Sequence, residues 1–121
     1  MKNKIEIKWR VEPQPHDYPA AYEYLCLVGS DVYARHAIQA LMDAPMRHFN
    51  AKDIFRASRL SLLGVSNSHV KKNIKKIRHG DPLSPILMVR HGNDLVIADG
   101  YHRMCAVYAF NEDAEIPCKL V

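Results

Sequence analysis

The sequence has no long apolar run and few cysteines. None of its segments approaches the roughly 18 consecutive apolar residues of a membrane span. The first residues, MKNK, lead into alternating polar and apolar sequence instead of the apolar core of a signal peptide. We therefore expect a cytoplasmic protein with no membrane partner.

The residue spacings that identify common metal and enzyme sites are also missing. The three cysteines, Cys26, Cys105 and Cys118, form an odd set without a CxxC pair, which argues against a disulfide framework and a zinc ribbon. None of the seven histidines follows a zinc-site spacing such as HxxxH. The sequence contains no GxSxG, Walker A or protein-kinase signature. We expect no metal site of the zinc type in this chain.

The length and composition are those of one globular domain. The chain has 121 residues, of which 48% are hydrophobic and 25% charged, with no repeats, linkers or low-complexity tracts. We predict a single domain over residues 1–121, of the α/β (α+β) class, in which a small mixed β-sheet packs with about four helices. Residues 1–50 are expected to form a strand plus a helical N-terminal extension, and residues 51–121 the core that carries the binding site.

Hydrophobic periodicity and the positions of proline and glycine predict the order of the elements. Ile5, Ile7, Trp9 and Val11 alternate with charged residues and predict a half-buried strand over residues 4–11. The remaining predicted elements are a helix over 17–28 capped by Asp17, a helix from Ser30 or Asp31 to before Pro45, a helix over 68–79, a hairpin of strands 86–89 and 95–98, a helix over 101–110 and a last strand over 116–121. Residues 46–67 show no sustained period, so we expect only short elements and loops there.

The net charge of +4 conceals a strongly basic segment. Residues 52–78 contain eight lysines and arginines against the single acid Asp53, a local balance of +7, so the rest of the chain carries −3. Such a segment attracts anions, which would be a nucleotide or a nucleic-acid backbone. The alternative is that these side chains form the solvated face of a helix. Asp53 is only a weak candidate for an acidic group of a site.

The stretch LVIADGYHRMCA, residues 95–106, carries the main candidate site. An apolar strand ends at Asp99-Gly100 and a helix begins at once, so the first turn of the helix offers unpaired N–H groups and the positive end of the helix dipole to an anion. Gly100 lets the backbone approach the anion closely, and His102 and Arg103 add side-chain donors. Two cationic residues at a helix N-terminus are unfavourable unless an anion offsets them. The alternative is that Asp99 caps the helix and Arg103 pairs with a surface carboxylate.

The segment from about residue 60 to residue 121 resembles the ParB/sulfiredoxin superfamily in the order and spacing of four parts. These are a polar helix, a strand beginning with Pro-Ile, a strand ending in Gly-x-[His/Arg/Thr]-Arg with a helix after it, and a closing Ile-Pro strand. In this chain they read Ser68–His79, Pro85–Val89, Asp99–Arg103 and Ile116–Val121. The resemblance implies that Gly100, His102 and Arg103 bind nucleotide phosphates. It also implies that the polar side of the preceding helix faces the same nucleotide, through His69, Lys72 and Lys76.

The sequence departs from the named branches of this superfamily. Sulfiredoxins have a catalytic cysteine where this chain has Tyr101, and because a phenol cannot replace a thiolate we do not expect sulfinic-acid reduction. ParB partition proteins have an Arg-Arg pair near the position of His102-Arg103. The free-serine kinases have Asp-Gly-His-Thr-Arg, which Asp99–Arg103 resembles. That resemblance implies a catalytic role for Asp99, either in orienting a magnesium ion or in accepting a proton.

Three functions stay open at this point. The first is a nucleotide-dependent enzyme, a kinase or an NTPase, that binds ATP or CTP and uses Asp99 with magnesium in phosphoryl transfer or hydrolysis. The second is a non-enzymatic nucleotide-sensing module, in which the ligand orders a helix or the surface of a homodimer. The third is a ParB-like DNA-binding or nuclease module that uses the basic segment. We favour the third least, because no DNA-reading helix-turn-helix stands out.

Overall fold

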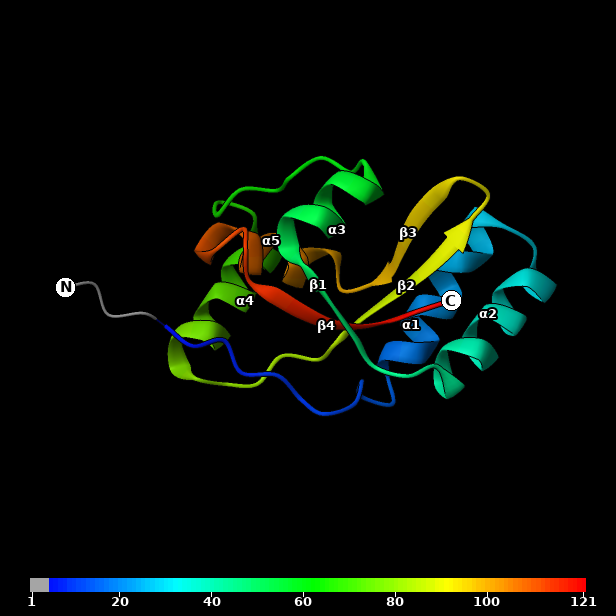
Figure 1. Ribbon diagram of the computed structural model, residues 1–121, viewed down its shortest axis with the longest axis horizontal. Helices are drawn as coiled ribbons and strands as arrows, with labels where there is room; N and C mark the ends of the chain where they lie inside the picture. Colours follow the sequence, from blue (N-terminus) through cyan, green and yellow to red (C-terminus); the bar gives the residue numbers. More distant parts are fainter. Residues whose placement is uncertain (1–4) are drawn as a thin grey trace.

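The computed structural model describes residues 5–121 and contains five helices and four strands in that part of the chain (Figure 1). In chain order they are α1 (Asp17–Val28), α2 (Asp31–Asp43), β1 (Arg47–Asn50), α3 (Ala51–Ser58), α4 (Ser68–His79), β2 (Ile86–His91), β3 (Asp94–Asp99), α5 (Tyr101–Phe110) and β4 (Glu115–Leu120). Among these residues no helix is both long enough and apolar enough to cross a lipid bilayer.

The four strands form one mixed sheet in the order β1-β4-β2-β3. Strands β2 and β3 make an antiparallel hairpin, β4 lies parallel to β2, and β1 is antiparallel to β4. The predicted α/β class with a mixed sheet is confirmed. Five helices pack with the sheet in the described residues, where about four were expected.

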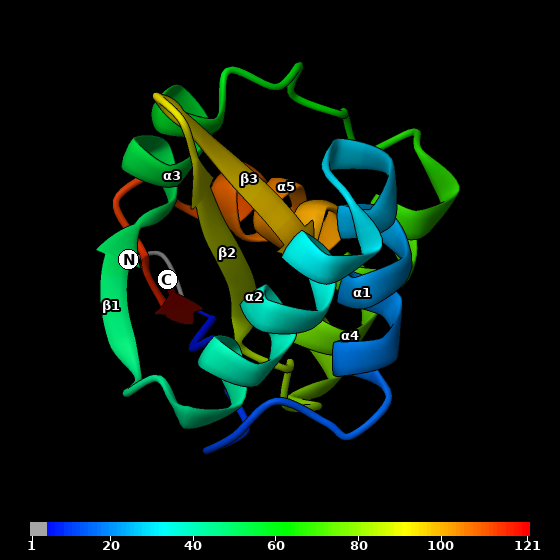
Figure 2. The same ribbon diagram turned by 90° about the vertical axis from the view of Figure 1, so that its right-hand side faces the viewer.

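Helices cover both faces of the sheet, so the protein has three layers (Figure 2). Because side chains alternate along a strand, Ile86 and Met88 of β2 point to one face and Leu87 and Val89 to the other. The first face packs with α3, α4 and α5, and the second packs with α1 and α2. All four residues are buried, as expected for a central strand that is covered on both sides.

The strand predicted over residues 4–11 is not formed. The first position of that range lies outside the described residues, and the rest is irregular apart from one parallel bridge between Trp9 and Leu83. Trp9 packs on the core, whereas Ile5 is 42% and Val11 is 87% exposed. The alternating pattern therefore marks a segment that packs on the core at Trp9. It does not form a strand, because only Leu83 pairs with it.

The stretch between residues 46 and 67 contains β1 and α3. Strand β1 pairs with β4, which lies much later in the chain, so that Phe49 is opposite Ile116. Helix α3 has eight residues with Ala51 and Ile54 buried, and it ends where Arg59 adopts a left-handed conformation with a φ of +57°. The last part of the segment predicted as an N-terminal extension is thus an edge strand of the sheet.

The helix ends follow the predicted chemistry with one exception. Ser30 caps α2, Asn67 caps α4, and Gly80 ends α4 with a φ of +76°. Asp17 was predicted to cap α1, and this prediction is wrong. Asp17 is the first residue of α1, it is buried, and its carboxylate accepts a hydrogen bond from the N–H of Gln14 at 2.9 Å. Asp17 does not cap the helix because its side chain turns back toward Gln14, in the interior of the fold.

Candidate functional site

The turn from β3 into α5 has the form that the sequence predicts. Asp99 is the last residue of β3, Gly100 has a φ of +107°, and α5 begins at Tyr101. Residues other than glycine rarely adopt such a φ. A side chain at position 100 would also place its Cβ 2.8 Å from Cγ1 of Ile86 and 2.9 Å from a guanidinium nitrogen of Arg103. The bend therefore requires glycine both for its backbone conformation and for the space that its neighbours occupy.

Asp99 and Arg103 form an ion pair across the first turn of α5. Nη2 of Arg103 lies 2.9 Å from Oδ2 of Asp99, and each side chain is 18% exposed. The same nitrogen donates a longer hydrogen bond, 3.4 Å, to the carbonyl oxygen of Pro85, while Nε of Arg103 is buried without a hydrogen-bond partner in residues 5–121. The alternative in which Asp99 caps α5 is wrong. Its carboxylate bonds to the guanidinium of Arg103 instead, and the cap position itself is Gly100, which has no side chain to accept a bond.

The carboxyl group of Asp99 lies in surroundings that disfavour its charge. Burial raises the pKa of Asp99 above its usual value, the guanidinium of Arg103 lowers it, and the nearby carboxylate of Asp17 raises it again. Arg103 thus offsets only part of the cost of burying this charge. If an anion drew the guanidinium away from Asp99, protonation of the carboxyl group would become more favourable.

Arg103 also lines a polar cavity of about 460 Å³ between the start of α1, the side of α4 and the segment that precedes β2. Lys76 reaches the same cavity from α4. Two of the residues predicted to bind phosphate therefore meet at one place, although they belong to different helices. Arg10 adds a third cation from the N-terminal segment, and Asp17 and Asp81 add two carboxylates. We call this space the polar cavity.

The balance of charge in the polar cavity favours a small anion. Its three cations, Arg10, Lys76 and Arg103, outnumber its two carboxylates. Asp17 is already engaged, because it is 3% exposed, accepts a backbone hydrogen bond and lies 3.4 Å from Nε2 of His16. The volume falls within the range of about 300–1,000 Å³ that is usual for small-molecule sites.

The other predicted phosphate ligands do not line the polar cavity. His69 and His102 stand in the first turns of α4 and α5, and their ring centroids are 4.7 Å apart, so the N-termini of the two helices meet. Burial lowers the pKa of His102, and the neighbouring His69 and Arg103 lower it further, which favours the neutral form of the ring. Lys72 is exposed on α4, and Gly100 shapes the turn. Of the six predicted ligands, two line the polar cavity, two form this histidine pair, and Lys72 and Gly100 belong to neither group.

Sequence reasoning missed Arg10 and Asp17 as parts of the site. Arg10 belonged to the charged side of a predicted strand, and Asp17 was interpreted as a helix cap. No spacing in the sequence relates either residue to Arg103, because their contact with the polar cavity arises only when the N-terminal segment packs beside Leu83. In the sequence nothing distinguishes Asp17 from an ordinary helix cap.

Neither Tyr101 nor Cys105 offers a reactive nucleophile. The hydroxyl of Tyr101 donates a hydrogen bond to the carbonyl oxygen of Ser61. Cys105 is completely buried, and burial raises the pKa of its thiol. Covalent chemistry at this turn therefore lacks a thiolate.

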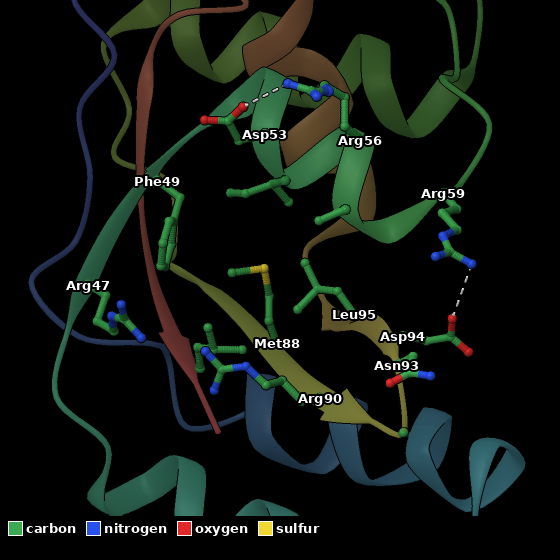
Figure 3. Close-up of a pocket in the computed structure, with 14 residues that line it drawn as sticks. Arg47, Phe49, Asp53, Arg56, Arg59, Met88, Arg90, Asn93, Asp94 and Leu95 are labelled. Atoms are coloured by element: carbon green, nitrogen blue, oxygen red, sulfur yellow. Dashed lines mark ion pairs between the residues drawn. The ribbon is translucent and has the colours of Figure 1, made fainter.

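A larger pocket, of about 550 Å³, opens between α3 and the sheet and contains none of the predicted phosphate ligands (Figure 3). Arg56 and Arg59 of the basic segment stand at its rim, and Asp53, the weak acidic candidate, lies 3.5 Å from Arg56. Lys52 of the same segment pairs with Asp113 at 2.6 Å. The basic segment is thus divided between α3 and α4, and three of its eight cations are in ion pairs.

No family model, curated protein or solved structure matches this chain. The resemblance to the ParB/sulfiredoxin superfamily therefore stays a prediction. Within residues 5–121, no three side chains of histidine, cysteine, aspartate or glutamate lie close enough together to hold a metal ion.

Proposed function

We propose that this protein binds a nucleotide, ATP or CTP, whose phosphates occupy the polar cavity. One observation carries the proposal: Arg103 and Lys76, two of the six phosphate ligands expected from the sequence, line the same cavity, and Arg10 lines it too. Cations from three separate segments converge there. Arginine forks match the geometry of phosphate oxygens, and lysine adds a compact charge.

Arg103 has N–H groups that remain available to donate hydrogen bonds to a phosphate. Nη2 alone serves both Asp99 and the carbonyl oxygen of Pro85, while the buried Nε has no partner in the described part of the chain. A buried donor without a partner costs about 1–3 kcal/mol, so a shift of the guanidinium toward a phosphate would relieve that cost. Asp99 then acts as a positioning residue, because it holds the guanidinium beside the cavity in the absence of ligand.

The phosphates supply most of the affinity in this proposal. Among the residues that line the polar cavity only Pro82 and Leu83 are apolar, and the single aromatic ring is the exposed imidazole of His16, which would stack on either base alike. We therefore expect ATP and CTP to bind with similar affinities and AMP to bind more weakly than either.

Magnesium fits the site as a companion of the phosphates. Magnesium sites in phosphate-binding proteins use one or two carboxylates together with phosphate oxygens, and Asp17 and Asp81 are the carboxylates that line the cavity. Asp17 is buried and already bonded. Asp81 is exposed and forms no ion pair within residues 5–121, so it is the residue that would hold the ion.

The geometry supports a binding module better than an enzyme. Asp99, the predicted catalytic residue, does not line the polar cavity and is paired with Arg103. For phosphoryl transfer or hydrolysis, its carboxylate would have to leave Arg103 and reach the ligand. A kinase or an NTPase would release ADP or CDP over time, whereas a nucleotide-sensing module would return its ligand unchanged.

Thermal unfolding in the presence of ATP, CTP and AMP, with and without magnesium, tests the proposal. A ligand at 100 times its Kd adds about 2.7 kcal/mol to the stability, and we expect such a gain with both triphosphates. Arg103→Gln and Lys76→Gln should each remove most of it. The control variant K71Q/K75Q removes two charges from the same helix outside the cavity lining and should keep it.

Two outcomes would contradict the proposal. One is full stabilisation by ATP in the K76Q protein, whose exposed substitution leaves the core untouched. The other is the absence of any shift in the wild-type protein with either triphosphate. Chromatography of the same samples for released diphosphate separates the enzyme from the binding module.

A further inference from the structure

The larger pocket has an apolar floor and a cationic rim because of the register of the sheet. Side chains two residues apart on a strand share a face, so Arg47 lies on the same face as Phe49, and Arg90 on the same face as Met88. Leu95 of β3 lies opposite Arg90 in the ladder. All five residues line the pocket. We call it the arginine-rimmed pocket.

The floor stays open because α3 is short. With eight residues it buries Ile54 against the sheet but leaves the side chains of Phe49, Leu95 and Leu120 partly exposed. A concave apolar surface of this kind binds apolar groups, and about 550 Å³ lies within the usual range of small-molecule sites, roughly 300–1,000 Å³.

The charges around the floor do not balance. Four arginines line the pocket against two aspartates. Arg56 and Arg59 are each paired with one of these aspartates, at 3.5 and 3.7 Å. Arg47 and Arg90 form no ion pair in the part of the chain that the structure describes, and the guanidinium of Arg47 lies 4.8 Å from the ring centre of Phe49. Two cations are therefore left beside an apolar surface.

In Figure 3 the guanidinium groups of Arg47 and Arg90 lie along one side of the pocket, next to the apolar floor to which Met88 also contributes. Two like charges at one site repel each other, and an anion bound between them offsets this repulsion because it attracts both. We propose that the arginine-rimmed pocket binds a small amphiphilic anion. Its aliphatic or aromatic body lies on the floor, and its carboxylate or phosphate group is held by Arg47 and Arg90.

This site is separate from the polar cavity. No residue lines both spaces. The polar cavity is mostly polar and takes phosphates, whereas the arginine-rimmed pocket requires an apolar body as well as a charge. The two proposals can therefore fail independently.

Two fluorescent probes with the same aromatic body test the requirement for charge. 1-Anilinonaphthalene-8-sulfonate is an anion, and N-phenyl-1-naphthylamine lacks the sulfonate. We expect saturable binding of the anionic probe at one site and weaker binding of the neutral one. The variant R47Q/R90Q should lower the affinity for the anionic probe about tenfold or more, since it removes the charge-assisted hydrogen bonds. It should leave the neutral probe unaffected, and K71Q/K75Q should change neither.

Competition completes the test. Octanoate and octyl phosphate, used below their micelle concentrations, distinguish a carboxylate from a phosphate head group, and displacement of the anionic probe by either one supports the proposal. Displacement by neither overturns it, as does equal affinity of the wild-type and R47Q/R90Q proteins for the anionic probe. Stabilisation by ATP should be the same in both proteins, because Arg47 and Arg90 lie outside the polar cavity.

Discussion

Replacing Gly100 by alanine tests how the turn between β3 and α5 is built, because two separate costs meet at this residue. The first is conformational: its φ of +107° lies beyond the left-handed region at about +50 to +70° that other residues occasionally use. The second is steric. The new Cβ would lie 2.8 Å from Cγ1 of the buried Ile86 and 2.9 Å from a guanidinium nitrogen of Arg103.

The expected loss in the free energy of unfolding is about 2–6 kcal/mol. Backbone strain outside the favoured regions contributes roughly 1–3 kcal/mol, and overpacking against a buried side chain contributes roughly another 1–3 kcal/mol. Two other glycines separate these contributions. Gly92 has a φ of +63° and no atom within 4 Å of an added Cβ, so alanine there should cost only the conformational part, about 1–2 kcal/mol. Gly64 has neither constraint, and alanine there should add about 0.4–1 kcal/mol of stability.

Urea denaturation followed by circular dichroism measures these differences. The order of stability should be G64A above wild type, G92A below it and G100A lowest. A loss in G100A no larger than the loss in G92A would contradict this order. In that case Ile86 and Arg103 would yield to the methyl group at no cost, and the turn would not be the tightly packed element that positions Arg103.

Two further predictions concern the start of α4 and the end of β3. Asn67→Ala removes the acceptor for the N–H groups of His69 and Val70 at the start of α4 and should lower the stability by about 1 kcal/mol in urea denaturation; an unchanged midpoint would refute this. Burial raises the pKa of Asp99 above the usual 3.8, so folding favours the protonated form of this carboxyl group. Its contribution to stability is complete below pH 3.8 and is lost as the pH rises through the folded-state pKa. The stability of wild type minus that of Asp99→Asn should therefore fall as the pH rises from below 3.8 through the folded-state pKa, and a rise would contradict the assigned environment.

The elements with strong local signals were predictable from the sequence. Helix α4 lies between Asn67 and Gly80, where capping chemistry and a left-handed glycine define its ends. The β3–α5 turn was predicted for the same kind of reason, since Asp99-Gly100 follows an apolar strand and only glycine suits the bend. These features depend on neighbours within a few residues, which a single sequence displays.

The features that the sequence did not reveal depend on distant contacts. Strand β1 has only four residues and is defined by pairing with β4, as in the contact of Phe49 with Ile116. The alternation around Trp9 is typical of a strand, but the segment finds only Leu83 as a bridge partner. In the site, Arg103 and Lys76 were predicted, whereas the contribution of Arg10 depends on how the N-terminal segment packs.

The most direct test of the central claim is an ATP titration followed by amide chemical shifts in ¹H–¹⁵N NMR spectra. If the phosphates occupy the polar cavity, the largest shifts should cluster at the residues that line it, around Arg10, Lys76 and Arg103. Shifts confined to Phe49, Arg90 and their neighbours in the arginine-rimmed pocket, or no shifts at all, would contradict the account.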